Sequence, residues 1–368
     1  IVNFAGNNIQ GNPMQAYRPT GAISFLGRYR VIDFPISNMS NSGIDSIQVY
    51  SRRKPRSLVE HLGTGRHYNI NSKRGNLNLL FCENGDENSI YSTDLAAYVE
   101  NLDAIEEMNE EYVVIVPSYM VYTADYEEFL QNHIESGADI TLMYFDNSDD
   151  STNCDYDGVY LKTDEDDKVL DMCYSEEKHR SNKKSMDAYI MKTTLLIDFI
   201  ETAIAHNKKH FFFDVIVPNF DRLVIQGYEY KGYVGCITSL EAYYNVNMDM
   251  LKPDVYKELF LGNRRIYTKS ADGAPAKYGP NAKVSNSLIC SGCEIDGEVE
   301  NSVIFRESQI AEGAVIKNSV VMAEGFIAPQ AEINNTILDR HVKVYSNAHL
   351  SGSSNHPVFI PKGASVNE

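Results

Sequence analysis

The chain has 368 residues, 43% of them hydrophobic, and its 24 tyrosines and 15 phenylalanines supply ample volume for a buried interior. One hydrophobic core rarely organises a chain of this length, so we expect two domains of unequal size. The formal net charge of −18 argues against binding to nucleic acid or to an anionic membrane surface, because their phosphates would be repelled.

No apolar run reaches the roughly 20 residues that a membrane-spanning helix needs, and residues 1–8 lack the basic and apolar regions of a signal peptide. The cysteines are spread along the chain, at Cys82, Cys154, Cys173, Cys236, Cys290 and Cys293. Cys290 and Cys293 form a CxxC pair, but no second pair or histidine group completes the four ligands of a zinc site. We therefore expect a cytoplasmic protein with six reduced, ordinary thiols.

In the first part of the chain, short runs of apolar and β-branched residues alternate with helical patterns. Strands are predicted at 45–50, 113–117 and 139–145, and helices near 93–108 and 126–136. Solid apolar strands between helices are typical of a mainly parallel sheet covered on both faces. The sequence therefore predicts an α/β domain of Rossmann-like type over residues 1–250.

A different pattern follows. Residues 251–280 contain several residues that break regular structure, namely Gly273, Pro275, Gly279 and Pro280, and we expect a linker there. Beyond them, an Asn-Ser or Asn-Thr pair recurs at Asn286, Asn301, Asn318 and Asn335. Aliphatic residues recur with these pairs, spaced by six and restarting every 17 residues: Ile304, Ile310, Ile316; Val321, Ile327, Ile333; Leu338, Val344, Leu350.

A coil of three short strands, each pointing one aliphatic side chain inward, produces this spacing, whereas an α-helix requires a period near 3.6. Residues 281–368 are therefore predicted to form a parallel β-helix of hexapeptide repeats, with Ile289 and Ile295 in an earlier, shorter coil. Such a small solenoid has open ends and flat faces, which another subunit tends to cover. We therefore expect an oligomer.

Several stretches resemble the bacterial sugar nucleotidyltransferases, and specifically the ADP-glucose pyrophosphorylases, also called glucose-1-phosphate adenylyltransferases. They are GRYRVIDFPISNMSNSGI at 27–44, SLVEHL at 57–62, SLEAYYNVNMDM at 239–250 and APAKY at 274–278. The resemblance covers nearly the whole chain. It implies a GT-A, Rossmann-like domain followed by a left-handed β-helix. In this family a sugar 1-phosphate attacks the α-phosphorus of a nucleoside triphosphate, and pyrophosphate leaves.

This chemistry needs a glycine-rich backbone cradle, basic side chains and carboxylates that hold Mg²⁺. Active members carry a G-G-x-G-T-R-L loop, whereas residues 5–21 here keep Gly6 and Gly11 but have no arginine before Arg18. The family's R-A-K-P-A run corresponds to residues 18–22, in which the lysine is lost. Two isolated glycines are equally a surface turn, so nucleotide binding by this loop stays open.

Both metal-binding aspartates of the family are also replaced. Tyr119 stands where active members have the aspartate of A-G-D-H-I-Y, and Cys236 where they have that of R-D-V-G-T-L-E-A-Y. A neutral phenol is not a hard anionic ligand at pH 7. Losing the ion's charge stabilisation costs several kcal/mol, which predicts a rate lower by roughly a thousandfold or more.

Other expected positions of a vestigial substrate pocket are altered too. Ser175 stands where the family's F-V-E-K-P has its lysine, although residues 178–180, a Lys-His-Arg run, leave this register open. Ser185 begins a run with Met and Asp that replaces S-M-G. Thr93 and Asp94 begin the stretch that replaces G-T-A-x-A. The losses thus fall on the chemistry, while the scaffold motifs persist.

This selectivity resembles the non-catalytic, D-type subunits of the family. The resemblance implies a regulatory subunit without a cofactor of its own, in a heterotetramer whose catalytic partner uses Mg²⁺ to make ADP-glucose for glycogen; alone, the chain would be a homo-oligomer. Two alternatives stay open. One is a weak adenylyltransferase with its metal on carboxylates such as Asp94, Asp187 or Asp214, and the other is a scaffold protein outside glycogen synthesis.

Basic residues stand out against the acidic chain on either side of the SLVEHL stretch: Arg52, Arg53, Lys54, Arg56, Arg66, Lys73 and Arg74. They can contact a phosphorylated effector or an acidic partner surface. A solvated basic loop is the alternative. The family's own effector-binding arginines near the two termini have no clear counterparts, so the resemblance assigns none.

Overall fold

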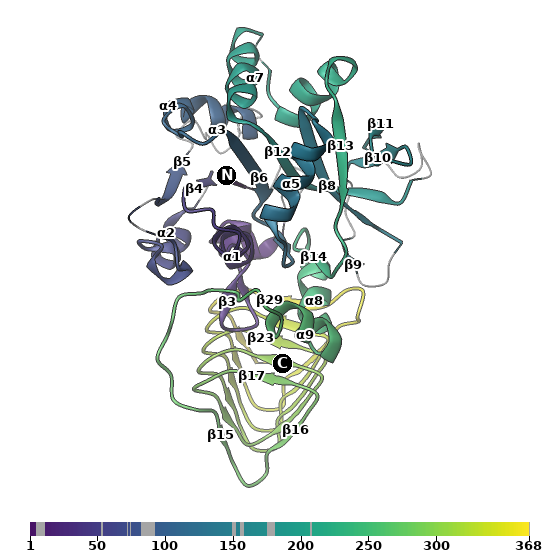
Figure 1. Ribbon diagram of the computed structural model, residues 1–368. Coiled ribbons are helices and arrows are strands. Elements are labelled where there is room, and N and C mark those ends of the chain that lie inside the picture. The colour runs from purple at the N-terminus through teal and green to yellow at the C-terminus, as the bar shows by residue number, and fades with distance from the viewer. Residues whose placement is uncertain are drawn as a thin grey trace.

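The computed structural model describes residues 1–4, 12–52, 54–71, 73, 75–81, 93–148, 152–154, 158–174, 181–206 and 208–367. Figure 1 shows an α/β domain, which contains the N-terminus, stacked on a β-solenoid formed by the C-terminal part of the chain. Both predicted fold classes are thereby confirmed. Within the described ranges, no helix is long and apolar enough to cross a membrane.

A mixed sheet forms the centre of the α/β domain. Its described strands run in the order β11-β10-β12-β6-β1-β4-β5, with β8 beside β12 and β13 beside β8. Their bounds are β1 Val2–Asn3, β4 Ile47–Ser51, β5 Leu77–Phe81, β6 Tyr112–Pro117, β8 Ile140–Asp146, β10 Tyr160–Thr163, β11 Val169–Cys173, β12 Lys183–Lys192 and β13 Ile225–Glu229. β1, β4, β5 and β6 are parallel, whereas β12 runs antiparallel to β6 and β8.

Both faces of this sheet are buried, as the solid apolar strands predicted. Alternate residues of β8 enter two different hydrophobic clusters: Leu142 and Tyr144 enter one, and Met143 and Phe145 the other. Because successive side chains of a strand point to opposite faces, the two clusters lie on opposite sides of the sheet.

Helices flank the sheet: α1 Asp33–Asn41, α2 Arg56–Leu62, α3 Asp94–Glu100, α4 Leu102–Glu106, α5 Tyr126–Ser136, α7 Thr193–Ala205, α8 Leu240–Asp249 and α9 Pro253–Phe260. Short helices are η2 Pro13–Ala16, η3 Thr20–Ala22, η4 Arg66–Tyr68, η5 Phe211–Ile216 and η6 Val217–Arg222. The helix predicted near 93–108 is divided at Asn101, whose side-chain amide donates to the Ala97 carbonyl at 2.9 Å. Asparagine competes in this way with regular backbone bonding.

Two small sheets complete the domain. β2 Ser24–Phe25 and β3 Tyr29–Arg30 form a hairpin, and β7 Met120–Val121, β14 Val234–Cys236 and β9 Thr152–Asn153 form a sheet in the order β7-β14-β9. β14 runs antiparallel to β7 and parallel to β9. The second sheet therefore brings three distant parts of the chain to one place.

The solenoid consists of three parallel sheets. They are β15-β18-β21-β24-β27-β30, β16-β19-β22-β25-β28 and β17-β20-β23-β26-β29. Their strands are β15 Lys277–Tyr278, β16 Lys283–Ser285, β17 Leu288–Ile289, β18 Glu294–Ile295, β19 Glu298–Glu300, β20 Val303–Ile304, β21 Gln309–Ile310, β22 Val315–Lys317, β23 Val320–Val321, β24 Phe326–Ile327, β25 Glu332–Asn334, β26 Thr336–Leu338, β27 Lys343–Val344, β28 His349–Ser351, β29 Val358–Ile360 and β30 Ser365–Val366.

The predicted aliphatic columns are confirmed by strand register. Ile304 pairs with Val321, which pairs with Leu338, and the columns starting at Ile310 and Ile316 repeat this on the other two sheets. The Asn-Ser and Asn-Thr pairs form one corner. Asn286, Asn301, Asn318 and Asn335 have φ of 40°, 45°, 46° and 46°, a left-handed conformation that asparagine tolerates well.

The stretch 251–280, expected as a linker, contains two regular elements. It begins with α9, whose Pro253 occupies the first turn, where a proline costs no hydrogen bond. It ends with β15, which pairs with β18 and so belongs to the solenoid. Gly279 here marks a close approach, since an added Cβ would lie 2.2 Å from Asp296 Oδ1.

The two domains share one hydrophobic cluster, in which Phe25 and Phe34 of the α/β domain meet Val303 and Phe305 of the solenoid. A buried ion pair between Arg18 and Asp339 joins the two domains. The Tyr244 hydroxyl of α8 donates to the Asn318 carbonyl at 2.7 Å. The junction is therefore both apolar and hydrogen-bonded.

Candidate functional site

The two positions that match the family's metal aspartates meet at the adjacent strands β7 and β14. Tyr119 precedes β7 and Cys236 ends β14, where Cys236 is paired with Met120. The Ile237 amide donates to the Tyr119 carbonyl at 2.8 Å. We call this place the strand corner, defined by Tyr119, Cys236 and the residues that bond to them.

Asp187 contacts the strand corner from the central sheet. It lies in a bulge of β12, where the register with β8 shifts between Ser185 and Ala188, and its φ is 50°. The Tyr119 hydroxyl donates to its carboxylate. Glycine is the usual residue at positive φ, which accounts for the glycine that the resemblance places here. Ser185, one of the expected positions of the substrate pocket, therefore lies two residues before Asp187, which contacts Tyr119.

A second carboxylate, Asp94, acts on Asp187 through its charge. Thr93 caps α3 by accepting from the Ala96 amide at 3.3 Å, and Asp94 accepts from the Leu95 and Phe211 amides at 2.9 and 3.2 Å. Burial raises the pKa of Asp94. Burial also raises the pKa of Asp187, the Tyr119 hydrogen bond opposes that rise, and the Asp94 charge adds to it. Two carboxyl groups thus act on each other here, and the charge of Lys184 opposes their effect by lowering the pKa of Asp187.

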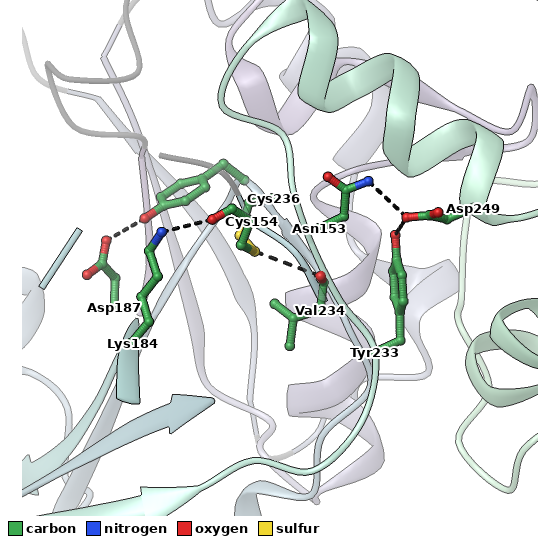
Figure 2. The surroundings of a disulfide bond; sticks show 9 residues. Asn153, Cys154, Lys184, Asp187, Tyr233, Val234, Cys236 and Asp249 are labelled. Atoms are coloured by element: carbon green, nitrogen blue, oxygen red, sulfur yellow. Dashed lines mark hydrogen bonds between the residues drawn. A yellow bond between two sulfur atoms is a disulfide. The ribbon is translucent and has the colours of Figure 1, made fainter. Parts of the chain in front are cut away.

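A disulfide between Cys154 and Cys236 closes the corner on its other side (Figure 2). The Cα atoms are 4.8 Å apart and the residues 82 positions apart in the chain. The expectation of six reduced thiols is therefore wrong for this pair. The reason is topological, because the parallel pairing of β9 with β14 brings two sequence-distant cysteines together. Cys173, Cys290 and Cys293 take no part in this disulfide, and Cys82 lies outside the described residues.

Hydrogen bonds extend from the disulfide in two directions (Figure 2). Lys184, only 1% exposed, donates its ammonium to the Cys154 carbonyl at 2.8 Å. On the other side, the Asn153 amide and the Tyr233 hydroxyl both donate to Asp249 Oδ2 at 2.9 Å. Asp249 is the last residue of α8, so the bonds link the disulfide to the helix that contacts the solenoid.

The side chains of the strand corner do not fit the Mg²⁺ ion of the family. The Tyr119 hydroxyl is bonded to Asp187, and Cys236 is oxidised, so neither presents an anionic ligand. Across the described ranges, no group of three or more His, Cys, Asp or Glu is placed to hold a metal. The Asp214 carboxylate accepts from the Lys209 and His210 amides at 2.8 Å each, which occupies it in its own loop.

The basic residues selected from the sequence make separate local contacts. Arg52 lies over the Phe4 ring at 5.3 Å, Lys54 donates to the Ala16 carbonyl, and the exposed Arg56 pairs with Glu60 at 2.9 Å. Arg66 begins η4, and Lys73 lies in the turn that precedes β5. Arg53, Arg74 and Ser175 lie outside the described residues, as do residues 5–11 of the glycine loop and the run 178–180.

A cavity at the domain junction was not predicted. Its volume is about 580 Å³, and its lining includes Arg28, Arg306 and Cys290. Arg28 belongs to the GRYR stretch, but nothing in the repeat pattern marked Arg306, because it occupies an ordinary turn of the solenoid. Burial raises the pKa of Cys290 to about 12, so its thiol is neutral at pH 7.

A mixed-sheet α/β domain joined to a parallel β-helix, with the two metal positions meeting at a strand corner, defines a sugar nucleotidyltransferase-like protein. Residues 12–249 match the family model described as nucleotidyl transferase, and residues 271–355 match the one described as GlmU-like, C-terminal hexapeptide. The chain belongs to the nucleotidyl transferase family.

Similar proteins fall into two groups by name. The chain is 34% identical over 354 residues to the glycogen biosynthesis protein GlgD of Bacillus subtilis (strain 168). The aligned region covers 95% of this chain and 91% of that protein. It is 33% identical to GlgD of Geobacillus stearothermophilus, over 83% of this chain and 78% of that one. It is 32% identical to the glucose-1-phosphate adenylyltransferase of Clostridium novyi (strain NT), over 80% of this chain and 78% of that one.

Proposed function

We propose that this chain is a pseudoenzyme, the non-catalytic regulatory subunit of a cytoplasmic glucose-1-phosphate adenylyltransferase. Its partner is an active subunit that makes ADP-glucose from ATP and glucose 1-phosphate for glycogen synthesis. The similarity to glycogen biosynthesis proteins, over 95% of the chain for one and 83% for the other, supports this setting.

One observation carries the proposal. Tyr119 and Cys236 occupy the two metal positions, and each is engaged elsewhere, Tyr119 by Asp187 and Cys236 by Cys154. Phosphoryl-type transfer depends on cations that neutralise the crowded anionic oxygens. The carboxylates of Asp94 and Asp187 lie near this corner, and the nearby Lys184 ammonium is engaged by the Cys154 carbonyl, so the arrangement favours exclusion of a triphosphate over its activation.

The same reasoning assigns the Mg²⁺ ion to the catalytic partner. The proposed assembly is a heterotetramer, and the solenoid offers it broad parallel sheets. A homo-oligomer is expected when the partner is missing. The basic residues around α2, Arg56 among them, remain candidates for an acidic partner surface or a phosphorylated effector.

The test is to measure pyrophosphate release from ATP and glucose 1-phosphate, with the purified chain alone and then with a catalytic subunit from the same organism. We expect no metal-dependent turnover alone, co-purification of the two chains, and a changed rate, substrate affinity or effector response of the partner.

Appreciable metal-dependent turnover by the chain alone would refute the regulatory assignment in favour of a weak adenylyltransferase. Failure to co-purify, together with an unchanged partner, would instead favour a scaffold protein outside glycogen synthesis. The control repeats the assay with a partner variant that lacks one metal aspartate. Any activity that remains must then come from this chain.

A further inference from the structure

The backbone pairing that holds β9 on β14 is short. β9 has two residues, and in the described part of the chain it pairs only with β14, through Thr152 with Val234 and Asn153 with Gly235. The Lys184 ammonium adds one hydrogen bond, to the Cys154 carbonyl. A strand this short is marginal on backbone pairing alone. The disulfide is therefore the strongest tie between β9 and β14.

We propose that the Cys154–Cys236 pair is a redox-controlled clasp. In the oxidised state it fixes β9 on β14 and, through Asn153, steadies the C-terminal end of α8; in the reduced state this corner loosens. The proposal does not depend on whether the chain is catalytic, because it concerns the link between the strand corner and the domain junction.

The route from the disulfide to the solenoid is continuous. Asn153 is next to Cys154 and donates to Asp249, which also accepts from Tyr233 and pairs with Lys252 at 2.8 Å. β14 and α8 are in close contact, because a Cβ added at Gly235 would lie 2.8 Å from Val246 Cγ1.

The middle of α8 contacts the solenoid corner. The Tyr244 hydroxyl donates to the Asn318 carbonyl at 2.7 Å and to Asn335 Oδ1 at 3.1 Å. A helix held at one end by the clasp and along its side by the solenoid transmits a change in either contact to the other. The redox state of the pair therefore biases how firmly α8 rests on the solenoid.

The chemistry requires an oxidant of the disulfide class, such as glutathione disulfide. One cysteine thiolate attacks a sulfur of glutathione disulfide and releases one glutathione. The second thiolate then displaces the other glutathione, so the Cys154–Cys236 bond forms while two electrons pass to the oxidant. A dithiol reductant reverses both steps.

Burial makes this exchange slow. Cys236 is 0% exposed and Cys154 is 4% exposed, so a reagent reaches the sulfurs only when the corner opens. The clasp therefore responds to a sustained change of the thiol pool rather than to a brief one.

The experiment compares hydrogen–deuterium exchange of the intact chain after equilibration with glutathione disulfide and after reduction with dithiothreitol. Mass spectrometry after alkylation verifies the state of the pair. We expect the amides of α8 to exchange at least about tenfold faster in the reduced chain, and those of α7, which lies at the opposite end of the domain (Figure 1), to be unchanged.

Cys154→Ser and Cys236→Ser should each behave like the reduced chain and no longer respond to dithiothreitol, whereas Cys173→Ser should respond like the wild type. If a clasp variant does not fold, the wild-type comparison still decides. Equal exchange of α8 in the two verified redox states would overturn the proposal. So would a pair that stays fully reduced in the folded chain under excess glutathione disulfide.

Discussion

The Tyr119 hydroxyl donates to the carboxylate of Asp187, a residue held in the left-handed conformation by a bulge of β12. The bond joins one of the two lost metal positions to a position where the resemblance places glycine. The replacement side chains at this corner thus bond to each other rather than to an ion.

Replacing this tyrosine tests how much the bond contributes. Tyr119→Phe removes one donor from Asp187 in a buried setting, so we expect the free energy of unfolding to fall by about 1–3 kcal/mol in urea titrations. The pKa of Asp187 should rise further, because the lost bond is one of the causes that lower it. Tyr17→Phe, at an exposed tyrosine, is the matched control. Unchanged stability of Tyr119→Phe would contradict the contact.

Asp94 gives the protein a pH dependence of definite sign. Burial raises its pKa above the ordinary value of 3.8, so the folded chain keeps a proton that the unfolded chain releases. The contribution of the Asp94 carboxyl group to the free energy of unfolding is fully present below pH 3.8 and is lost as the pH rises through its folded-state pKa.

Asp94→Asn abolishes that titration. Unfolding free energies measured from pH 3.8 upward should then decline less steeply than in the wild type, and stability at pH 7 should be higher. Asp103→Asn, at an exposed carboxylate of α4, controls for the general change in charge. A variant with the same slope as the wild type would show that Asp94 is not the group responsible.

The buried pair between Arg18 and Asp339 should be costly to break from one side. Arg18→Ala leaves Asp339 buried without its cation, and we expect a loss of about 3–5 kcal/mol in unfolding free energy. Arg56→Ala, which breaks an exposed pair, should have no measurable effect. Replacing both partners with Arg18→Met and Asp339→Leu should recover much of the loss, and a double variant as unstable as Arg18→Ala would argue against this account.

Restoring the two aspartates should not restore an active enzyme. Tyr119→Asp with Cys236→Asp supplies the metal carboxylates of the family, but the glycine loop at residues 5–21 and the position of Ser175 stay altered. Pyrophosphate release should therefore remain far below that of an active family member assayed in parallel. Full activity of the double variant would show that the metal positions are the only deficit.

The solenoid was the most predictable part of the molecule. Each coil repeats the same three inward positions, so local spacing encodes the tertiary contacts, and Ile304, Val321 and Leu338 stack as expected. The β8 and β6 strands were equally clear, because continuous apolar runs reflect burial on both faces.

The strand corner was only half predictable. Motif matching identified Tyr119 and Cys236 as altered positions, but the partners Asp187 and Cys154 come from other strands. Their pairing depends on the arrangement of β9, β12 and β14, which no local spacing contains. The basic residues do not act as one group, although the sequence placed them together. Contacts such as that of Lys54 with Ala16 depend on how the segments fold over one another.

The Asn-Ser corner of the solenoid repeats one hydrogen bond from coil to coil. The amides of Ser302, Ser319 and Thr336 each donate to the hydroxyl one coil earlier, at 3.1 Å. Inserting or deleting one whole coil would preserve this ladder and change the solenoid length by about one strand spacing, 4.7–4.9 Å. An insertion of any other length would break the ladder unless it looped out. The distance from the domain junction to the far end of the solenoid can therefore change between relatives only in discrete steps.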